Sequence, residues 1–510
     1  MGQAEAGSPA SPSRAGGDSP HAKRYTTIDI PKEPTGIQGL DWVLQGGFPR
    51  GRVTLVCGGP GSGKTVLGME FIYRGAEQGM PGMFVSFEEE AVSLRRNALS
   101  LGWDLQRLEK QNLLGLLDPM PRPGSVPAGE FSLHGLAAIL TGKAEELGVC
   151  RIAIDAIDVL LRLFKDPIQE REELHFLHAW LLKKGMTAVL TVKRDGANGT
   201  DQYGFLDYMA DCVLMLDQRI TTQISTRRVR VLKYRGSGFG RNEYPFIIED
   251  GGINLLPVSE AELSYQPMGP TVPSGLPGLD SILNGGYRRN STLLISGAPG
   301  IGKTTIASCF VREACSRGER VLYINLEESE ESMVQCMLSP GVDLRPALEQ
   351  GALVIRTLMP ESMGAEEHLI RILRELDSFG ASHLVIDAVS ACKRMGSKQS
   401  TFEFLLRIIY GCKDRGVTCL FTNQETLPAQ SMEFDEFGIL SMIDTVLVLR
   451  YEERDGSLQR SILAVKSRGN RHSTRRHHFT IGDQGIEIHD AGPFDPNRPG
   501  GSGLGESHAR

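Results

Sequence analysis

No apolar run in the sequence approaches the roughly 18 residues that a membrane-spanning helix needs. The first 24 residues are rich in Ser, Pro, Gly and Ala but contain no apolar stretch of the signal-peptide kind. The nine cysteines follow neither C-x-x-C nor Cys/His ligand spacing, which favours buried cysteines in a reducing compartment. The formal net charge of −7 argues against a chain built mainly to coat nucleic acid. These absences predict a cytoplasmic protein without a membrane segment.

Two glycine-rich motifs stand out in what is present. Each reads G-x-x-x-x-G-K-T and follows a short apolar run, at 53–57 and at 292–296. Glycines let backbone N–H groups surround an anion, and the helix that follows points its positive end at the same phosphates. In such a P-loop the lysine reaches the β- and γ-phosphates and the next hydroxyl ligates Mg²⁺. The predicted nucleotide-binding residues are Gly58, Gly59, Pro60, Gly61, Ser62, Gly63, Lys64 and Thr65, and then Gly297, Ala298, Pro299, Gly300, Ile301, Gly302, Lys303, Thr304 and Thr305, with Lys64 and Lys303 acting on the phosphates and Thr65 and Thr304 on the metal.

An internal repeat sets the domain organisation. The segment Pro34–Asp41 resembles Pro273–Asp280, and these segments, like the two P-loop lysines, are 239 residues apart. Within each copy short apolar runs alternate with amphipathic helical patterns, which is typical of an α/β domain. We therefore predict two tandem P-loop NTPase domains, each a mostly parallel twisted sheet flanked by helices. The predicted boundaries are a disordered tail at 1–24, a first domain at 25–256, a linker at 257–272, a second domain at 273–490 and a disordered tail at 491–510.

Aspartates close two of the apolar runs. Asp155 ends the strand expected at 151–155, and Asp387 ends the one expected at 383–387. Ligands of an α/β sheet sit at the carboxyl ends of its strands, so both residues suit a Walker B aspartate that holds the Mg²⁺ shell. An aspartate that merely caps the next helix is the alternative.

Paired glutamates follow two further strands. Glu88 and Glu89 come after the strand expected at 82–87, and Glu327 and Glu328 come after the one expected at 323–326. A carboxylate beside a triphosphate can orient and deprotonate the attacking group, and repulsion within the pair can raise one pKa. A solvated run of charge is the alternative, but the recurrence in both copies favours a catalytic role.

A basic pattern recurs late in each copy. It is Lys233-Tyr234-Arg235-Gly236 in the first and Lys466-Ser467-Arg468-Gly469 in the second. An arginine can stabilise the charge that develops on a transferring phosphoryl group. Such a residue can come from a neighbouring subunit, which would make the site an interface and the protein a ring. A basic hairpin edge without this role is the alternative, and spacing alone does not choose between the two.

With these features together, the chain resembles the KaiC family, the double-domain RecA-like ATPases of the circadian clock. The resemblance covers about Tyr25 to Ile488. It is carried by Phe87-Glu88-Glu89, by Leu101-Gly102-Trp103-Asp104-Leu105, by Lys233–Gly236 with Glu243-Tyr244-Pro245-Phe246, and by Ile443-Asp444-Thr445-Val446.

The resemblance implies two stacked hexameric rings with ATP and Mg²⁺ between subunits, so we expect a homohexamer. It implies a hydrolytic base pair in the first ring and, in the second, a base and Mg²⁺ partners beside a γ-phosphate that can pass to the protein itself. The residues concerned are Glu88 and Glu89 for the first ring, Glu327 and Glu328 for the second, Lys233, Arg235, Lys466 and Arg468 across subunit boundaries, and Ser100 and Arg460 as further ATP-binding residues.

Ser441 is the phosphorylation site that the resemblance implies. It takes the position of the threonine in the family's autophosphorylated pair, whereas Leu440 takes that of the serine and has no hydroxyl. Asp435 stands where the family has a nearby threonine, so at most one site of the usual pair is present. Other departures are Ala156 and Ala388 after the Walker B aspartates, Pro340 in place of an aromatic residue near the nucleotide base, and a C-terminal tail unlike the segment through which the clock protein's activator works.

We therefore expect a KaiC-like ATPase with serine/threonine autokinase activity, acting as a nucleotide-dependent hexameric signalling or clock-type regulator with response-regulator or KaiB-like protein partners. A RecA-like DNA-dependent ATPase is one alternative, because residues 471–478 form a basic segment. That segment lacks the interleaved aromatics that stack on bases, so a nucleic-acid partner is not expected. A nucleotide-switched scaffold with little turnover is the other alternative.

Overall fold

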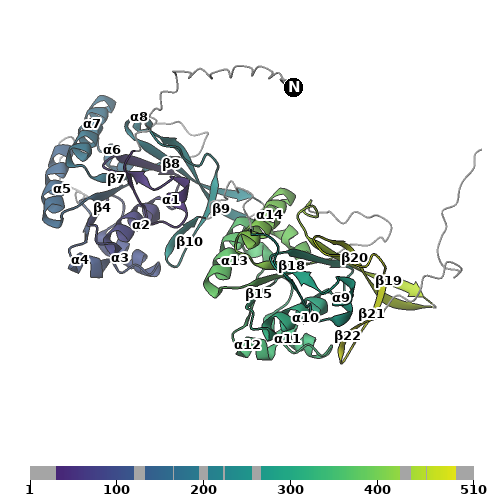
Figure 1. The fold of residues 1–510 in the computed structure, drawn as a ribbon. Helices are drawn as coiled ribbons and strands as arrows, with labels where there is room; N and C mark the ends of the chain where they lie inside the picture. The colour runs from purple at the N-terminus through teal and green to yellow at the C-terminus, as the bar shows by residue number, and fades with distance from the viewer. Residues whose placement is uncertain are drawn as a thin grey trace, which may run out of the picture.

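The computed structural model describes residues 30–119, 132–164, 166–194, 205–221, 224–255, 266–424, 438–454 and 456–489. Two domains of the same architecture follow one another along the chain (Figure 1). The elements of the first are β1 (Lys32–Glu33), α1 (Leu40–Val43), β2 (Phe48–Pro49), β3 (Val53–Gly58), α2 (Lys64–Glu77), β4 (Gly82–Ser86), α3 (Ala91–Ser100), α4 (Leu105–Lys110), β5 (Leu114–Leu117), α5 (Leu133–Leu147), β6 (Arg151–Asp155), α6 (Ile157–Leu161), α7 (Pro167–Lys184), β7 (Thr187–Lys193), α8 (Leu206–Met209), β8 (Cys212–Thr221), β9 (Ile224–Tyr234), β10 (Tyr244–Glu249) and β11 (Gly252–Leu255).

The second domain begins within the predicted linker, with a short strand at Thr271. Its elements are β12 (Thr271–Val272), α9 (Pro277–Ile282), β13 (Tyr287–Arg288), β14 (Thr292–Gly297), α10 (Lys303–Ser316), β15 (Val321–Asn325), α11 (Glu330–Leu338), α12 (Arg345–Glu349), β16 (Leu353–Thr357), η1 (Pro360–Ser362), α13 (Ala365–Phe379), β17 (His383–Asp387), η2 (Val389–Met395), α14 (Lys398–Asp414), β18 (Thr418–Gln424), β19 (Thr445–Arg454), β20 (Ser457–Ser467), β21 (His477–Gly482) and β22 (Gly485–His489). Both predicted tails and residues 257–265 of the predicted linker lie outside the described residues.

A nine-stranded sheet forms the centre of each domain. In the first domain the strand order is β5-β4-β6-β7-β3-β8-β9-β10-β11, and in the second it is β16-β15-β17-β18-β14-β19-β20-β21-β22. The strands from β5 to β8 pair in parallel, and β9 to β11 continue the sheet in antiparallel pairs. The predicted fold, two tandem domains with mostly parallel sheets, is confirmed.

The central strands are apolar because helices cover both faces of the sheet. All six residues of β3 are buried, as expected for a parallel strand between two helical layers. Successive side chains of β3 point to opposite faces: Val56 belongs to the core cluster with α1 to α4, and Leu55 to the one with α5 to α8. The predicted strands at 151–155 and 383–387 match the structure, and the other predicted strand ends differ by one to three residues.

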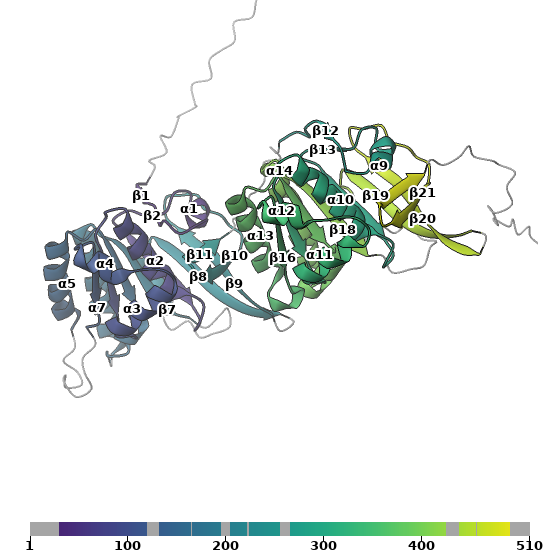
Figure 2. The ribbon, with the colours of Figure 1, turned by 90° about the horizontal axis from the view of Figure 1, so that it is seen from below.

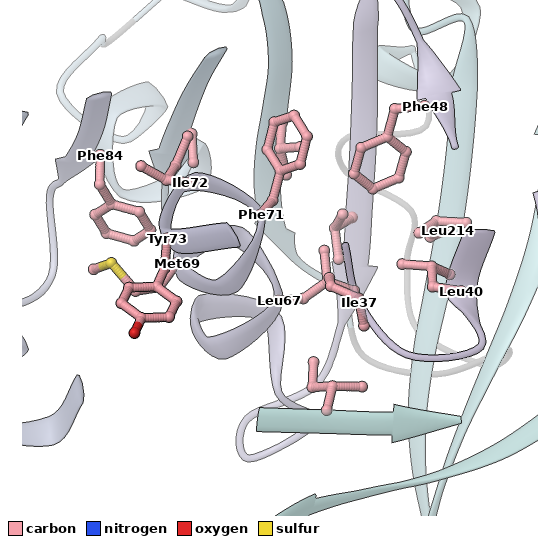
Figure 3. Packing of buried hydrophobic residues seen from close by; sticks show 14 of the residues in the cluster. Ile37, Leu40, Phe48, Leu67, Met69, Phe71, Ile72, Tyr73, Phe84 and Leu214 are labelled. Carbon is pink, nitrogen blue, oxygen red and sulfur yellow. The ribbon is translucent and has the colours of Figure 1, made fainter. Parts of the chain in front are cut away.

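The P-loop helix α2 is fixed on its sheet by aromatic and aliphatic packing. Phe71 of α2 meets Phe48 of β2 edge to face, with ring centroids 5.2 Å apart. Leu67 and Ile72 lie in the same cluster, together with Phe84 of β4 (Figure 3). A fully buried aliphatic or aromatic side chain contributes about 1.5–3 kcal/mol. This packing fixes the position of the P-loop, which lies at the start of α2.

The two domains touch where β9 and β10 of the first approach α13 of the second (Figures 1 and 2). Arg228 of β9 pairs with Glu366 of α13 at 2.5 Å, and Glu249 of β10 pairs with Arg374 of α13. No helix among the described residues is long and apolar enough to cross a membrane. All nine cysteines lie in the described residues, and none of them forms a disulfide.

Candidate nucleotide-binding sites

Both P-loops have the backbone that a phosphate cradle needs. Gly61 and Gly63 have φ values of 71° and 98°, and Gly300 and Gly302 have values of 71° and 114°. Side chains other than glycine rarely adopt this left-handed region. The helices α2 and α10 begin at the P-loop lysines, so their unpaired N–H groups face the same space.

The first domain joins the predicted magnesium residues. Thr65 donates its hydroxyl to Asp155 Oδ2 at 2.9 Å, and Thr191 donates to the other carboxylate oxygen. Burial raises the pKa of Asp155. A hydroxyl and one carboxylate, completed by phosphate oxygens and water, form the set that Mg²⁺ takes in P-loop proteins. These residues fit the ion, although the described residues contain no cluster of three or more His, Cys, Asp or Glu that could hold a metal unaided.

The second domain surrounds its aspartate differently. Asp387 accepts hydrogen bonds from the Tyr323 hydroxyl at 2.7 Å and from Thr422. Burial, and then the charge of Asp387, raise the pKa of Tyr323, so the phenol stays a donor. The first domain has Phe84 at this place in the repeat. Tyr323 is a further site residue to which no sequence motif points. The signal in the sequence is that the repeat pairs it with a phenylalanine, which has no hydroxyl. In both domains the peptide bond after the aspartate is cis.

Glu88 and Glu89 have different surroundings in the structure. Partial desolvation, and then the negative charges of Asp155 and Asp158, raise the pKa of Glu88. Burial lowers the pKa of Lys64, which the Asp155 and Glu88 charges oppose. Glu88 therefore shares the electrostatic environment of the P-loop lysine and the Walker B aspartate. Glu89 accepts a hydrogen bond from Asn97 of α3 at 2.9 Å, and its charge also acts to raise the pKa of Asp155.

The paired glutamates of the second domain are held by their backbone. The N–H groups of Glu327 and Glu328 donate to Asn325 Oδ1 at 3.1 and 3.0 Å. Lys303 donates to the carbonyl oxygens of Gly297 and Ala298, both at 2.9 Å, so the lysine lies across its own loop. The strand end, the loop and the lysine thus meet at one edge of the sheet, as predicted.

The basic hairpin of the first domain lies at the other end of the sheet. The Asp211 N–H donates to the Val53 C=O at the start of β3 (2.9 Å), and the Arg235 N–H donates to the Asp211 C=O (2.8 Å). The P-loop begins at Gly58, the last residue of β3. With a rise of about 3.3 Å per residue, Arg235 stands on the order of 16 Å from the P-loop of its own chain.

Backbone carbonyls hold the hairpin cations in both domains. Lys233 Nζ donates to the Asp207 and Ala210 carbonyls, and Arg235 Nη2 donates to the Tyr208 carbonyl at 2.7 Å. In the second domain the equivalent residues make the corresponding hydrogen bonds. There the donors and acceptors are Lys466 Nζ with the Leu440 carbonyl (2.8 Å) and Arg468 Nη2 with the Ser441 carbonyl (2.7 Å).

Comparison with known proteins agrees with this geometry. The family model "ATPase: KaiC" matches residues 33–260 and again 272–492. The chain belongs to the KaiC family. The circadian clock protein KaiC2 of Synechocystis sp. is 37% identical over 473 residues, which cover 91% of this chain and 82% of the relative. The circadian clock oscillator protein KaiC of Parathermosynechococcus lividus is 34% identical over 465 residues, which cover 91% and 86%. The predicted family is confirmed, and both domains are KaiC-type ATPase domains.

A cleft of about 450 Å³ lies beside the C-terminal half of the P-loop helix α2, where Tyr73 and Arg74 line it. Ser100 and Leu101 line one side of it, and Asp250 and Gly251, in the turn between β10 and β11, line another. Trp103 Nε1 donates to the Gly251 carbonyl at 3.3 Å. Strand β10 links this turn to the P-loop, because a Cβ on Gly63 would lie 2.9 Å from Ile248 Cδ1. The predicted residue Ser100 thus lines a cavity beside the P-loop helix.

The structure adds one arginine to the first site. Arg227 of β9 donates from Nε to the Gly61 carbonyl in the P-loop at 3.1 Å. Its counterpart in the second domain is Arg460, whose guanidinium lies 5.9 Å from the ring centroid of Tyr451 and whose Nε is buried without a partner. The offset that relates Lys233 to Lys466 also relates Arg227 to Arg460, so the repeat contained the signal.

The remaining predicted features lie apart from the P-loops. Ser441 is exposed just before β19. In the basic segment 471–478, Arg476 pairs with Glu452 at 2.8 Å and His477 contacts the Ser473 hydroxyl at 2.8 Å. Asp435 lies outside the described residues. The segment's charge is thus partly satisfied within the domain.

Proposed function

We propose that this KaiC-family protein hydrolyses ATP at sites shared between copies of the chain, as a hexameric nucleotide-dependent regulator, and that its second domain phosphorylates Ser441. The observation that carries the proposal is the separation of the two half-sites. In each domain the P-loop and the strand-end acids lie at one end of the sheet, and the hairpin cations lie at the other. One chain therefore cannot complete its own site, whereas a neighbour's hairpin can.

The first domain supplies the groups that hydrolysis needs. Lys64 and the helix end hold the phosphates, while Thr65 and Asp155 hold Mg²⁺, which neutralises charge on the β- and γ-phosphates. Glu88, with its raised pKa, orients the attacking water and accepts its proton. Arg235 of a second copy stabilises the charge on the transferring phosphoryl group. The cleft at Ser100 receives the nucleotide base.

Two features of the second domain support phosphorylation of Ser441. Its hydroxyl is exposed, and its backbone carbonyl accepts a hydrogen bond from Arg468, the residue proposed to reach the neighbour's γ-phosphate. A hydroxyl on the residue that anchors the phosphate-binding arginine is well placed as an acceptor. The relatives named as circadian clock proteins make a clock-type regulator with protein partners the natural role.

ATP turnover by mixed chains tests the shared site. Lys64→Ala removes the P-loop lysine and Arg235→Ala removes the hairpin cation, each in a chain that carries Lys303→Ala to silence the second domain. We expect each variant alone to lose roughly 10³-fold in turnover. A random equimolar mixture should recover about a quarter of its interfaces, because an intact P-loop then meets an intact hairpin that often.

Arg241→Ala, at a neighbouring exposed arginine, is the matched control and should turn over ATP like the parent chain. If native mass spectrometry shows mixed rings and turnover still does not return, the shared site is wrong. Phosphopeptide mapping after incubation with ATP and Mg²⁺ tests Ser441 separately. Label that persists elsewhere in a Ser441→Ala chain, with none at Ser441 in the parent, refutes that assignment.

A further inference from the structure

The segments before β8 and β19 occupy the same place in the two domains. In the second domain the Asp444 N–H donates to the Thr292 C=O at 2.9 Å, as the Asp211 N–H does to the first residue of β3. The Arg468 N–H then donates to the Asp444 C=O at 2.9 Å, which repeats the bond between Arg235 and Asp211. These equivalent bonds align the two segments with each other residue by residue.

In that register Tyr208 lies where Ser441 lies. Each is three residues before the anchoring aspartate, and each gives its carbonyl oxygen to the hairpin arginine at 2.7 Å. The first domain therefore places a second hydroxyl at the point where the second domain places its proposed acceptor.

Within the described part of the chain, the Tyr208 side chain is largely uncovered. It is 79% exposed, an unusual exposure for an aromatic residue next to an arginine that is itself held by backbone. Large exposed aromatics are enriched where a protein meets a partner. The phenol reaches further from the backbone than a serine hydroxyl.

We propose that Tyr208 is a phosphoryl acceptor, modified by ATP bound at the first P-loop of a neighbouring copy. The phenol oxygen forms a bond to the γ-phosphorus, the bond from that phosphorus to the β,γ-bridging oxygen breaks, and ADP leaves. The phenol proton passes to the neighbour's Glu88 carboxylate. This inference rests on the proposed shared site, because only a second copy brings a P-loop to this end of the sheet.

Phosphopeptide mapping of four full-length variants, incubated with ATP and Mg²⁺, tests it. We expect phosphate on both Tyr208 and Ser441 in the parent chain. Tyr208→Phe keeps the ring and should lose only the first label, and Ser441→Ala should lose only the second. Lys64→Ala should abolish the label at Tyr208 alone, and Lys303→Ala should abolish the label at Ser441 alone. The reason is that each proposed acceptor faces the nucleotide bound by the same domain of the neighbouring copy.

The outcomes separate this inference from the proposed function. Label on Ser441 without label on Tyr208 overturns the inference and leaves the function standing. Label on Tyr208 that survives Lys64→Ala shows a different donor and also overturns it. If neither residue is labelled while ATP is hydrolysed, the autokinase part of the function fails and Tyr208 fails with it.

Discussion

Glu70 lies on the P-loop helix α2, and its substitution tests how that helix is held. The side chain is fully buried on α2. Its carboxylate accepts the Ile253 N–H of β11 at 2.7 Å and the Arg74 guanidinium at 3.1 Å. Burial raises the pKa of Glu70 to about 7, although the Ile253 N–H and the Arg74 charge act in the opposite direction.

The stability of the first domain should therefore fall as pH rises. Between the ordinary value of 4.5 and about 7, the folded chain holds a proton on Glu70 that the unfolded chain has lost. One pKa unit corresponds to about 1.4 kcal/mol, so the ionised form lowers the free energy of unfolding by about 3 kcal/mol. Below pH 4.5 this loss is absent, and above pH 7 it is complete.

Glu70→Gln keeps an acceptor for Ile253 and removes the titration. The variant should unfold at nearly the same denaturant concentration as the parent at pH 5, and be more stable by about 3 kcal/mol at pH 8. Urea denaturation without nucleotide measures this through tryptophan fluorescence, because the three tryptophans, Trp42, Trp103 and Trp180, all lie in the first domain.

The second domain serves as the internal control, since Cys309 takes the place of Glu70 in the repeat. Far-ultraviolet circular dichroism should show its unfolding unchanged by Glu70→Gln at either pH. An equal stability difference between variant and parent at pH 5 and pH 8, or a variant less stable at pH 8, would refute the reasoning.

Three further predictions follow from other parts of the chain. Glu88→Gln should lower ATP turnover by the first domain by about 10²- to 10⁴-fold, measured with the second P-loop disabled. A larger loss of turnover in Glu89→Gln than in Glu88→Gln would assign the catalytic base to Glu89 instead. Arg228→Ala breaks the ion pair with Glu366 and should raise amide exchange in α13 by roughly fivefold, or about 1 kcal/mol; unchanged exchange would show that the pair contributes nothing. Burial lowers the pKa of His383 to about 4, so the second domain should lose stability as pH falls from 6.5 toward 4, and His383→Gln should flatten this dependence in acid denaturation.

The parts of the site that could be predicted are those whose chemistry is local in sequence. The G-x-x-x-x-G-K-T spacing fixes a turn and a helix start within eight residues, so the P-loops are where they were expected. Apolar runs bounded by glycine or charge gave the central strands, because a parallel strand buried on both faces leaves little choice of residue. The strand-end position of Asp155 and Glu88 follows from the same runs.

The remainder depends on residues far apart in the chain. Tyr323 reaches Asp387 across 64 positions, and its partner in the repeat is a phenylalanine that makes no such bond. Arg228 and Glu366 are surface charges until the two domains meet, and a charged residue on an exposed strand carries no information about its partner. The hydrogen bond from Arg235 to the Tyr208 carbonyl could not be predicted either, because every residue type carries a backbone carbonyl.

Half-sites at opposite ends of a sheet dictate how copies of the chain can associate. If every copy makes the same head-to-tail contact at the proposed shared site, a pair of copies leaves one P-loop and one hairpin unused. Repeated head-to-tail contacts form a closed ring if the rotation between copies closes, and an open fibre if it does not. Because one polypeptide carries both domains, rings closed through the proposed shared sites have the same number of members in both domains.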